Sequence, residues 1–315
     1  MKIKILLSLL AINMSLSCSN DQLQDDIDEM TIKEEVLKND HKVNFINNYY
    51  SGWNENIRYP SPDNDPQFFD IWLPEKRNIS DTHLFVFIHG GSFTGGDKTD
   101  SEYVAAINAI KSQFPNSAIA TINYRVGLTM LLDKPIMDVQ SALHYLIGQA
   151  PLMNISNNNI VLIGESAGAY LAFFEAFRRD SQLGNQKRYK AVVSLSGFAE
   201  IIPKSDSNTT FANLIALQAL TVKVPNLNFN EYSPLNRITN LIQANDFPEI
   251  YLFYGESDKV LSGSNSKNIY KKIQESGVQK YIDKSYIRSF PNQGHTMNSS
   301  VKNTIAQILT QKLVF

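Results

Sequence analysis

From about residue 45, short apolar runs alternate with longer amphipathic runs, and this pattern limits the folds open to the chain. The short runs are rich in Val, Ile, Phe and Tyr, and most are too continuous to be half-exposed strands. They predict strands at residues 69–73, 84–88, 118–123, 160–163, 191–195, 250–254 and 286–290. Helical patterns lie at residues 101–114, 136–148, 168–179, 265–275 and 299–311. The alternation predicts an α/β fold, with a mostly parallel central sheet and helices on both faces.

The composition is that of a globular chain and excludes several classes of protein. Of the 315 residues 43% are hydrophobic, and the formal net charge is only −2, so the chain can bury a sizeable core. The same small charge excludes the basic surface of a nucleic-acid-binding protein. The single cysteine excludes a disulfide framework, a cysteine zinc site and an iron–sulfur cluster.

Residues 200–245 interrupt the alternation, because they carry apolar residues but no clear strand. In sheets of this kind, ligands bind beyond the C-terminal ends of the strands. We therefore interpret the segment as a small cap inserted over those ends. The sequence predicts one α/β domain over residues 46–315, with its cap insertion at about residues 200–245.

The first residues of the chain predict an export signal. Lys2 and Lys4 precede an apolar run at residues 5–12, which is too short to span a bilayer permanently. The run leads to Cys18, the only cysteine, in an arrangement that resembles the lipobox of bacterial lipoproteins, in which the thiol is lipidated. An ordinary cleaved signal peptide is the alternative.

Lipidation of Cys18 would make residues 1–17 the signal peptide and residues 18–45 an acidic tether with few apolar side chains to pack. An acidic patch soon after the lipidated cysteine is similar to the surface-export signal of some Gram-negative lipoproteins. We therefore expect the protein in a bacterial cell envelope, at the outer membrane or cell surface. Its contact with the membrane would be through the lipid anchor only.

The segment Gly164-Glu165-Ser166-Ala167-Gly168 stands between a predicted strand and a predicted helix. A G-x-S-x-G motif requires that context, because its turn is too tight for side chains at the glycine positions. The turn exposes the serine oxygen above the sheet and directs the helix N-terminus at developing negative charge. Ser166 is therefore the predicted nucleophile.

A serine nucleophile needs a base, and the positions of the five histidines leave one candidate. Where the nucleophile stands on such a turn, the base comes last in the chain, on a loop after the final strand. His41 lies in the tether, His83 precedes a strand, His89 belongs to a glycine motif and His144 lies inside a helical run. Only His295 fits the role.

The third member of the site orients His295 and stabilises its imidazolium form. Asp258 follows the predicted strand at residues 250–254, where this chemistry places a carboxylate. Glu256, two residues earlier in the same turn, is the alternative.

Backbone donors for an oxyanion are expected where glycines follow a strand. His89-Gly90-Gly91-Ser92 ends the predicted strand at residues 84–88, and glycines there let N–H groups approach a ligand. We expect the donors to be the N–H groups of Gly90 and Gly91, together with that of Ala167 after the nucleophile. His89 itself is expected to support the loop.

These motifs stand in an order that resembles the α/β-hydrolase carboxylesterases, over residues of about 65–315. The likeness is strongest to the acetylxylan/feruloyl-esterase-like and hormone-sensitive-lipase-like branches. It rests on residues 70–74, 89–92, 123–125, 135–138, 164–168, 255–258 and 295. The family has His-Gly-Gly-Gly where this chain has Ser92 in the last position, and the role of Ser92 stays open.

The resemblance implies a serine esterase that acts through an acyl-enzyme, with no cofactor and no metal. Together with the envelope location, it suggests acyl groups on polysaccharides, or other small esters, as substrates. The same framework serves peptidases and amidases, so an amide substrate is an alternative. A non-catalytic binding lipoprotein of this fold is another, although no member of the predicted triad is missing.

Overall fold

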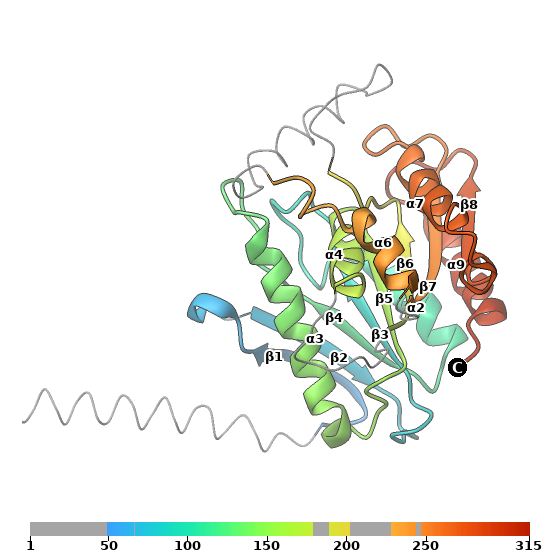
Figure 1. The fold of residues 1–315 in the computed structure, drawn as a ribbon. Coiled ribbons are helices and arrows are strands. Elements are labelled where there is room, and N and C mark those ends of the chain that lie inside the picture. Colours follow the sequence, from blue (N-terminus) through green and yellow to red (C-terminus); the bar gives the residue numbers. More distant parts are fainter. Residues whose placement is uncertain (1–48, 66, 179–188, 202–227, 244–246) are drawn as a thin grey trace, which may run out of the picture. The chain divides into compact units, whose positions relative to one another are not determined.

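The computed structural model describes residues 49–65, 67–178, 189–201, 228–243 and 247–315. These residues build one eight-stranded sheet with the order β1-β2-β4-β3-β5-β6-β7-β8 (Figure 1). The strands are β1 (Gly52–Tyr59), β2 (Gln67–Leu73), β3 (Leu84–Ile88), β4 (Ala118–Ile122), β5 (Ile160–Glu165), β6 (Tyr189–Leu195), β7 (Glu249–Gly255) and β8 (Ser285–Phe290). Every strand predicted from the sequence is present.

The sheet is parallel from β4 through β3, β5, β6 and β7 to β8, whereas β2 pairs antiparallel with β1 and with β4. The sequence did not predict β1. Its residues are polar or half-exposed at most positions, as befits an edge strand with one neighbour. A short apolar run of the kind used to find the other strands is therefore absent from β1.

Helices cover both faces of the sheet, as predicted. They are α2 (Ser101–Gln113), α3 (Asp133–Met153), α4 (Ala167–Ala176), α6 (Ile238–Gln243), α7 (Ser264–Gln274), α8 (Gln279–Ile282) and α9 (Ser299–Lys312), with short 3₁₀ turns η2 (Pro62–Asn64) and η4 (Pro234–Arg237). Strand β3 shows how the layers form, because all its residues are buried and alternate between two cores. Phe85 and Phe87 face α2 and α9, whereas Leu84, Val86 and Ile88 face the core that contains α3 and α4.

The predicted cap is described only in part, because residues 202–227 and 244–246 lie outside the described residues. Residues 234–243 form η4 and α6, and Leu235, Ile238 and Leu241 join the core on the α4 side of the sheet. Tyr170 of α4 donates a hydrogen bond to the carbonyl of Tyr232, 2.6 Å away. That this insertion covers the strand ends stays a prediction.

In the part of the chain that the structure describes, no helix combines the length and the apolar character needed to cross a bilayer. The predicted signal peptide, Cys18 and nearly all of the predicted tether precede residue 49 and lie outside the described residues.

Candidate active site

Ser166 stands in a sharp turn between β5 and α4. Its backbone angles are φ 54° and ψ −117°, in a region that non-glycine residues rarely adopt. The flanking glycines are required, since a Cβ on Gly164 would collide with Ala169 and a Cβ on Gly168 would collide with the carbonyl of Ile88. This strand, strained serine and helix are the arrangement that the sequence predicted.

The structure brings His295 and Asp258 together. Asp258 lies three residues beyond the end of β7, and His295 lies in the loop between β8 and α9. His295 Nδ1 is 2.8 Å from Asp258 Oδ2, and the Asp258 side chain is completely buried. The N–H groups of Val260 and Leu261 donate to Oδ1 at 2.8 and 2.9 Å, so both carboxylate oxygens have partners. An ionised carboxylate only accepts, which leaves the proton on Nδ1 and the lone pair on Nε2 of His295.

Glu256, the alternative to Asp258, has a different environment. Its side chain is exposed, and its Oε1 accepts a hydrogen bond from Ser289 Oγ at 2.6 Å. The turn itself is held by the loop that carries the histidine, because Ser257 N donates to Gln293 O at 2.9 Å. A Cβ on Gly255 would collide with that loop, so the close approach of the two turns requires glycine there. This packing directs Asp258 to His295.

Parallel pairing puts all three groups at one edge of the sheet. Ser166 follows β5, Asp258 follows β7 and His295 follows β8, and these strands run in the same direction with only β6 between β5 and β7. The C-terminal ends of parallel strands meet at the edge where ligands bind in such sheets.

The glycine loop after β3 lies against Ser166, but it corrects one of the expected donors. A Cβ on Gly90 would lie 3.2 Å from Ser166 Cβ, which confirms the close approach. The N–H of Gly90, however, donates to the hydroxyl of Tyr103 at 2.6 Å. The prediction that this N–H faces an oxyanion is therefore wrong, because its hydrogen is already used.

Two of the expected donors stay available. No hydrogen bond among the described residues uses the N–H of Gly91, whose φ of 99° and contact with Gly95 exclude any side chain. Ala167 is the first residue of α4, so its N–H has no helical acceptor. Ser92 replaces the expected third glycine in the left-handed region, with φ 54°.

His89 packs against the glycine loop and holds it in place. It is buried, its Nδ1 lies 2.9 Å from the carbonyl of Gly90, and its ring stacks on Tyr124 at 4.1 Å. Burial lowers the pKa of His89, so the ring is neutral and Nδ1 donates to that carbonyl. The Tyr124 hydroxyl donates to the carbonyl of His89 at 2.7 Å. These contacts agree with the supporting role expected for His89.

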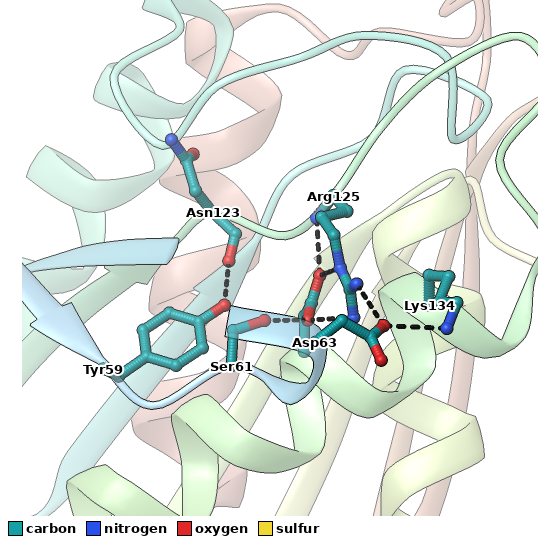
Figure 2. Close-up of polar contacts among 7 residues, drawn as sticks. Tyr59, Ser61, Asp63, Asn123, Arg125 and Lys134 are labelled. Carbon is teal, nitrogen blue, oxygen red and sulfur yellow. Dashed lines mark hydrogen bonds and ion pairs between the residues drawn. The ribbon is translucent and has the colours of Figure 1, made fainter. Parts of the chain in front are cut away.

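An ionic network, buried at Arg125 and Asp138 and exposed at Asp63, holds the loop that follows β4 (Figure 2). Arg125 Nε and its terminal nitrogen bind both oxygens of the fully buried Asp138 at 2.8 and 2.9 Å. Ser61 donates to the same carboxylate at 2.8 Å, and Asp63 accepts from Arg125 and Lys134, each at 2.8 Å. A bidentate arginine–carboxylate pair of this kind fixes the orientation of both side chains as well as their position. The network thereby positions the segment on which the glycine loop rests.

Comparison with known proteins identifies the family of this chain. The profile of the BD-FAE family matches residues 69–273, more than half of the chain. The chain belongs to the BD-FAE family.

Individual relatives of this BD-FAE family member are distant. A curated relative named Esterase LipC, from Mycobacterium tuberculosis, is 20% identical over 223 residues, which cover 67% of this chain and 53% of the relative. The alignment thus spans about half the length of that protein.

Solved structures agree on the α/β-hydrolase fold. A carboxyl esterase 2 from the mycorrhizal fungus Tuber melanosporum superposes with a TM-score of 0.65 at 12% identity, over 85% of this chain and 89% of its own. A truncated carbohydrate esterase from gut microbiota gives 0.63 at 19% identity, over 84% of this chain and 97% of its own. At these identities the likeness establishes the fold alone.

A small apolar cavity adjoins Ser166 in this BD-FAE family member. Its volume is about 30 Å³. It is lined by Ser92, Phe93, Ser166, Ala167, Phe198, Val260 and Leu261. The lining therefore joins Ser166, the glycine loop and the turn after Asp258.

Sequence reasoning missed two residues beside the site. No sequence pattern identifies Tyr103 as a site residue, because its partner Gly90 lies on another element. Lys302 had a signal, since it stands on the apolar stripe of α9 that contains Ile305, Ala306 and Leu309. A lysine in such a stripe indicates a buried cation. In the described part of the chain, no group of three or more His, Cys, Asp or Glu residues could hold a metal ion.

Proposed function

We propose that this chain hydrolyses carboxylic esters, with Ser166 as nucleophile, His295 as base and Asp258 as the acid that orients the base. The observation that carries the proposal is the 2.8 Å hydrogen bond between His295 Nδ1 and the buried carboxylate of Asp258. That bond leaves Nε2 of the ring as the basic nitrogen at the edge of the sheet where Ser166 stands.

The reaction follows from these roles. Ser166 Oγ attacks the ester carbonyl while His295 takes its proton, and the same proton leaves with the alcohol. Water then attacks the acyl-enzyme, again with His295 as base, and releases the acid. The negative oxygen of each intermediate would be bound by the N–H groups of Gly91 and Ala167, the donors that stay available.

Acyl groups on polysaccharides, or on other small esters, are the proposed substrates. One structural neighbour is described as a carbohydrate esterase from gut microbiota, which supports a carbohydrate ester. The test is a panel of nitrophenyl esters, acetylated xylan, feruloyl esters and a nitroanilide. Release of acid from the esters and none from the anilide is expected. Faster cleavage of the anilide would make the chain an amidase, and no cleavage of any substrate would contradict the proposal.

The cavity beside Ser166 leads to a prediction about acyl length. A water molecule needs roughly 10–15 Å³ in this measure, so a pocket of about 30 Å³ suits a short acyl chain such as acetyl or propionyl. The alcohol of a polymer must reach solvent, which leaves this small apolar pocket for the acyl side. Nitrophenyl acetate should therefore be cleaved faster than the octanoate, by about tenfold or more.

Phe198→Ala tests the pocket, because it removes one of the two aromatic rings, Phe93 and Phe198, that line it. The ratio of octanoate to acetate turnover should rise in this variant by about tenfold or more. Phe174→Ala removes a comparable buried ring outside the pocket and should leave the ratio unchanged. An equal change in both variants would disprove the acyl assignment.

We also propose that Cys18 carries a lipid that holds the protein in the cell envelope. Cys18→Ser should move the protein from the membrane fraction to the soluble fraction, or block removal of its signal peptide, because the chain has no other thiol. Fractionation and labelling with radioactive palmitate measure both effects. Palmitate on the Cys18→Ser protein would contradict the proposal.

A further inference from the structure

A second cavity lies at the C-terminal end of α4, and the proposed reaction does not use it. Its volume is about 440 Å³. Sites for small molecules usually have volumes of about 300–1,000 Å³. Phe174, Phe177 and Leu241 form its apolar lining. An α-helix rises about 1.5 Å per residue, so Phe174 lies roughly 12 Å along α4 from Ser166. The cavity is therefore separate from the active site.

The polar part of the lining contains two arginines, one carboxylate and one amide, namely Arg178, Arg237, Glu231 and Asn240. Two of these side chains have partners within the protein. Arg178 donates to the two carboxylate oxygens of Glu175, at 3.0 and 3.3 Å. Glu231 accepts a hydrogen bond of 2.7 Å from the Asn228 amide. The positive charge of Arg178 is therefore already balanced.

Arg237 has no such partner for its charge. Its Nη2 donates to the main-chain carbonyl of Glu231 at 2.8 Å, and its guanidinium lies 4.3 Å from the centre of the Phe174 ring. Among the residues that the structure describes, no carboxylate lies within ion-pair distance of Arg237. The side chain is half-buried, and burial lowers its pKa. A cation partly removed from water without an anion destabilises the folded chain, so an anionic ligand would offset this cost.

The backbone that carries Arg237 is held in place. Arg237 is the last residue of η4, and the N–H of the buried Leu235 donates to the carbonyl of Ala199 at 2.8 Å. Just before η4, the buried Ser233 hydroxyl accepts a hydrogen bond of 3.0 Å from the N–H of Ile201. A ligand would therefore meet a guanidinium whose backbone is already ordered, which lowers the entropic cost of binding.

The charge and shape of the lining select the chemistry of the ligand. One unbalanced guanidinium suits a single negative charge, and its planar fork matches the two oxygens of a carboxylate. A phosphate dianion would carry excess charge and would be repelled by the Glu231 carboxylate in the wall. The Asn240 amide both donates and accepts, as hydroxyl groups require. The apolar lining suits the C–H groups of a sugar ring.

We propose that this cavity binds a uronic acid, that is, a sugar that carries a carboxylate. The carboxylate pairs with Arg237, and ring hydroxyls bind the Asn240 amide. The inference goes beyond ester hydrolysis and does not depend on it.

The test is a titration of D-glucuronate into the intact chain, followed by ligand-observed NMR. For a ligand of this size, saturable binding with a Kd of about 1 mM is expected. Three matched probes separate the contributions to binding. D-glucose has the ring without the carboxylate, acetate has the carboxylate without the ring, and inorganic phosphate is another anion. Each should bind about tenfold more weakly than glucuronate, or more weakly still.

Two substitutions in the lining should weaken the binding of glucuronate. Arg237→Gln removes the charged partner of the carboxylate and should raise the Kd by about tenfold or more. Asn240→Asp keeps the shape of an exposed side chain and places a like charge beside the ligand, which should raise the Kd by roughly threefold.

Arg288→Gln is the matched control. The guanidinium of Arg288 also lies over a phenyl ring, 5.1 Å from the centre of Phe290, but this arginine is exposed and is not part of the lining. Its replacement should leave the Kd for glucuronate unchanged.

The outcomes decide the inference in both directions. Glucuronate binding that is weakened in Arg237→Gln and retained in Arg288→Gln supports it. Absence of saturable glucuronate binding by the folded wild type overturns it, and so does equal binding of glucose or tighter binding of phosphate. If thermal unfolding shows that Arg237→Gln does not fold, Asn240→Asp decides, and an unchanged Kd in that variant overturns the inference. The proposed function fails separately, through a wild-type protein that cleaves no ester, because the titration uses none.

Discussion

Replacing Ser166 with alanine is expected to lower ester turnover by about 10⁴-fold or more, because the members of a catalytic triad act as a unit. Folding should be unaffected. Alanine retains the Cβ of serine, so the backbone strain at φ 54° is unchanged, and only one buried oxygen is lost. Initial rates on nitrophenyl acetate measure the first effect, and thermal unfolding measures the second.

A matched control for this variant is Ser92→Ala, which removes another hydroxyl from the lining of the same cavity. It should retain most of its activity, because the proposed chemistry does not use that oxygen. Near-wild-type turnover in Ser166→Ala would sink the assignment of the nucleophile.

Asp258→Asn is expected to cost about 10⁴-fold in turnover. The amide cannot stabilise the imidazolium as a carboxylate does. It would also satisfy His295 with the wrong tautomer, in which Nε2 carries the proton. The buried carboxylate accepts hydrogen bonds from three donors, His295 Nδ1 and the N–H groups of Val260 and Leu261. The substitution therefore changes a known set of hydrogen bonds.

Glu256→Gln is the internal control for that prediction, because this exposed carboxylate stands in the same turn and binds only Ser289 among its described contacts. It should lower turnover by about tenfold at most. Steady-state rates of the two variants on one activated ester decide between them. A larger loss in Glu256→Gln than in Asp258→Asn would transfer the role of the acid to Glu256.

The sequence predicted the buried strands and most of the helices, because their signals are local. A run such as that of β3 is apolar at every position only when both faces of the strand are covered, and this can be recognised without the rest of the molecule. Strand β1 carries no such signal, since it is the edge of the sheet and many of its residues face solvent. Its place follows from pairing with β2, a contact that neither segment specifies alone.

In the candidate site too, some features could be predicted from local sequence and others could not. Gly164-Glu165-Ser166-Ala167-Gly168 could be found from the sequence, because a tight turn between a strand and a helix restricts residue types within five positions. The sequence could not decide whether Asp258 or Glu256 faces His295. Both lie in one turn after β7, and the direction of each side chain is set by the approach of the histidine loop to Gly255.

The error at Gly90 has a similar cause. Glycines after a strand indicate that the backbone is approached closely, but they do not indicate by what. At Gly91 the close approach is to Gly95, and the N–H is left without a partner among the described residues. At Gly90 the N–H is taken by Tyr103, which α2 delivers to the loop only after the helix has packed on the sheet.

The sequence alone therefore determined the fold class, the tight turn at Ser166 and the one histidine that follows the last strand, since each depends on residues close together in the chain. The tertiary structure alone decided which carboxylate faces His295, which N–H groups stay available and that Lys302 lies buried against Glu165. These depend on distances between side chains that are far apart in the chain. Such distances are set by the packing of helices and loops on the sheet, which no local pattern of residues encodes.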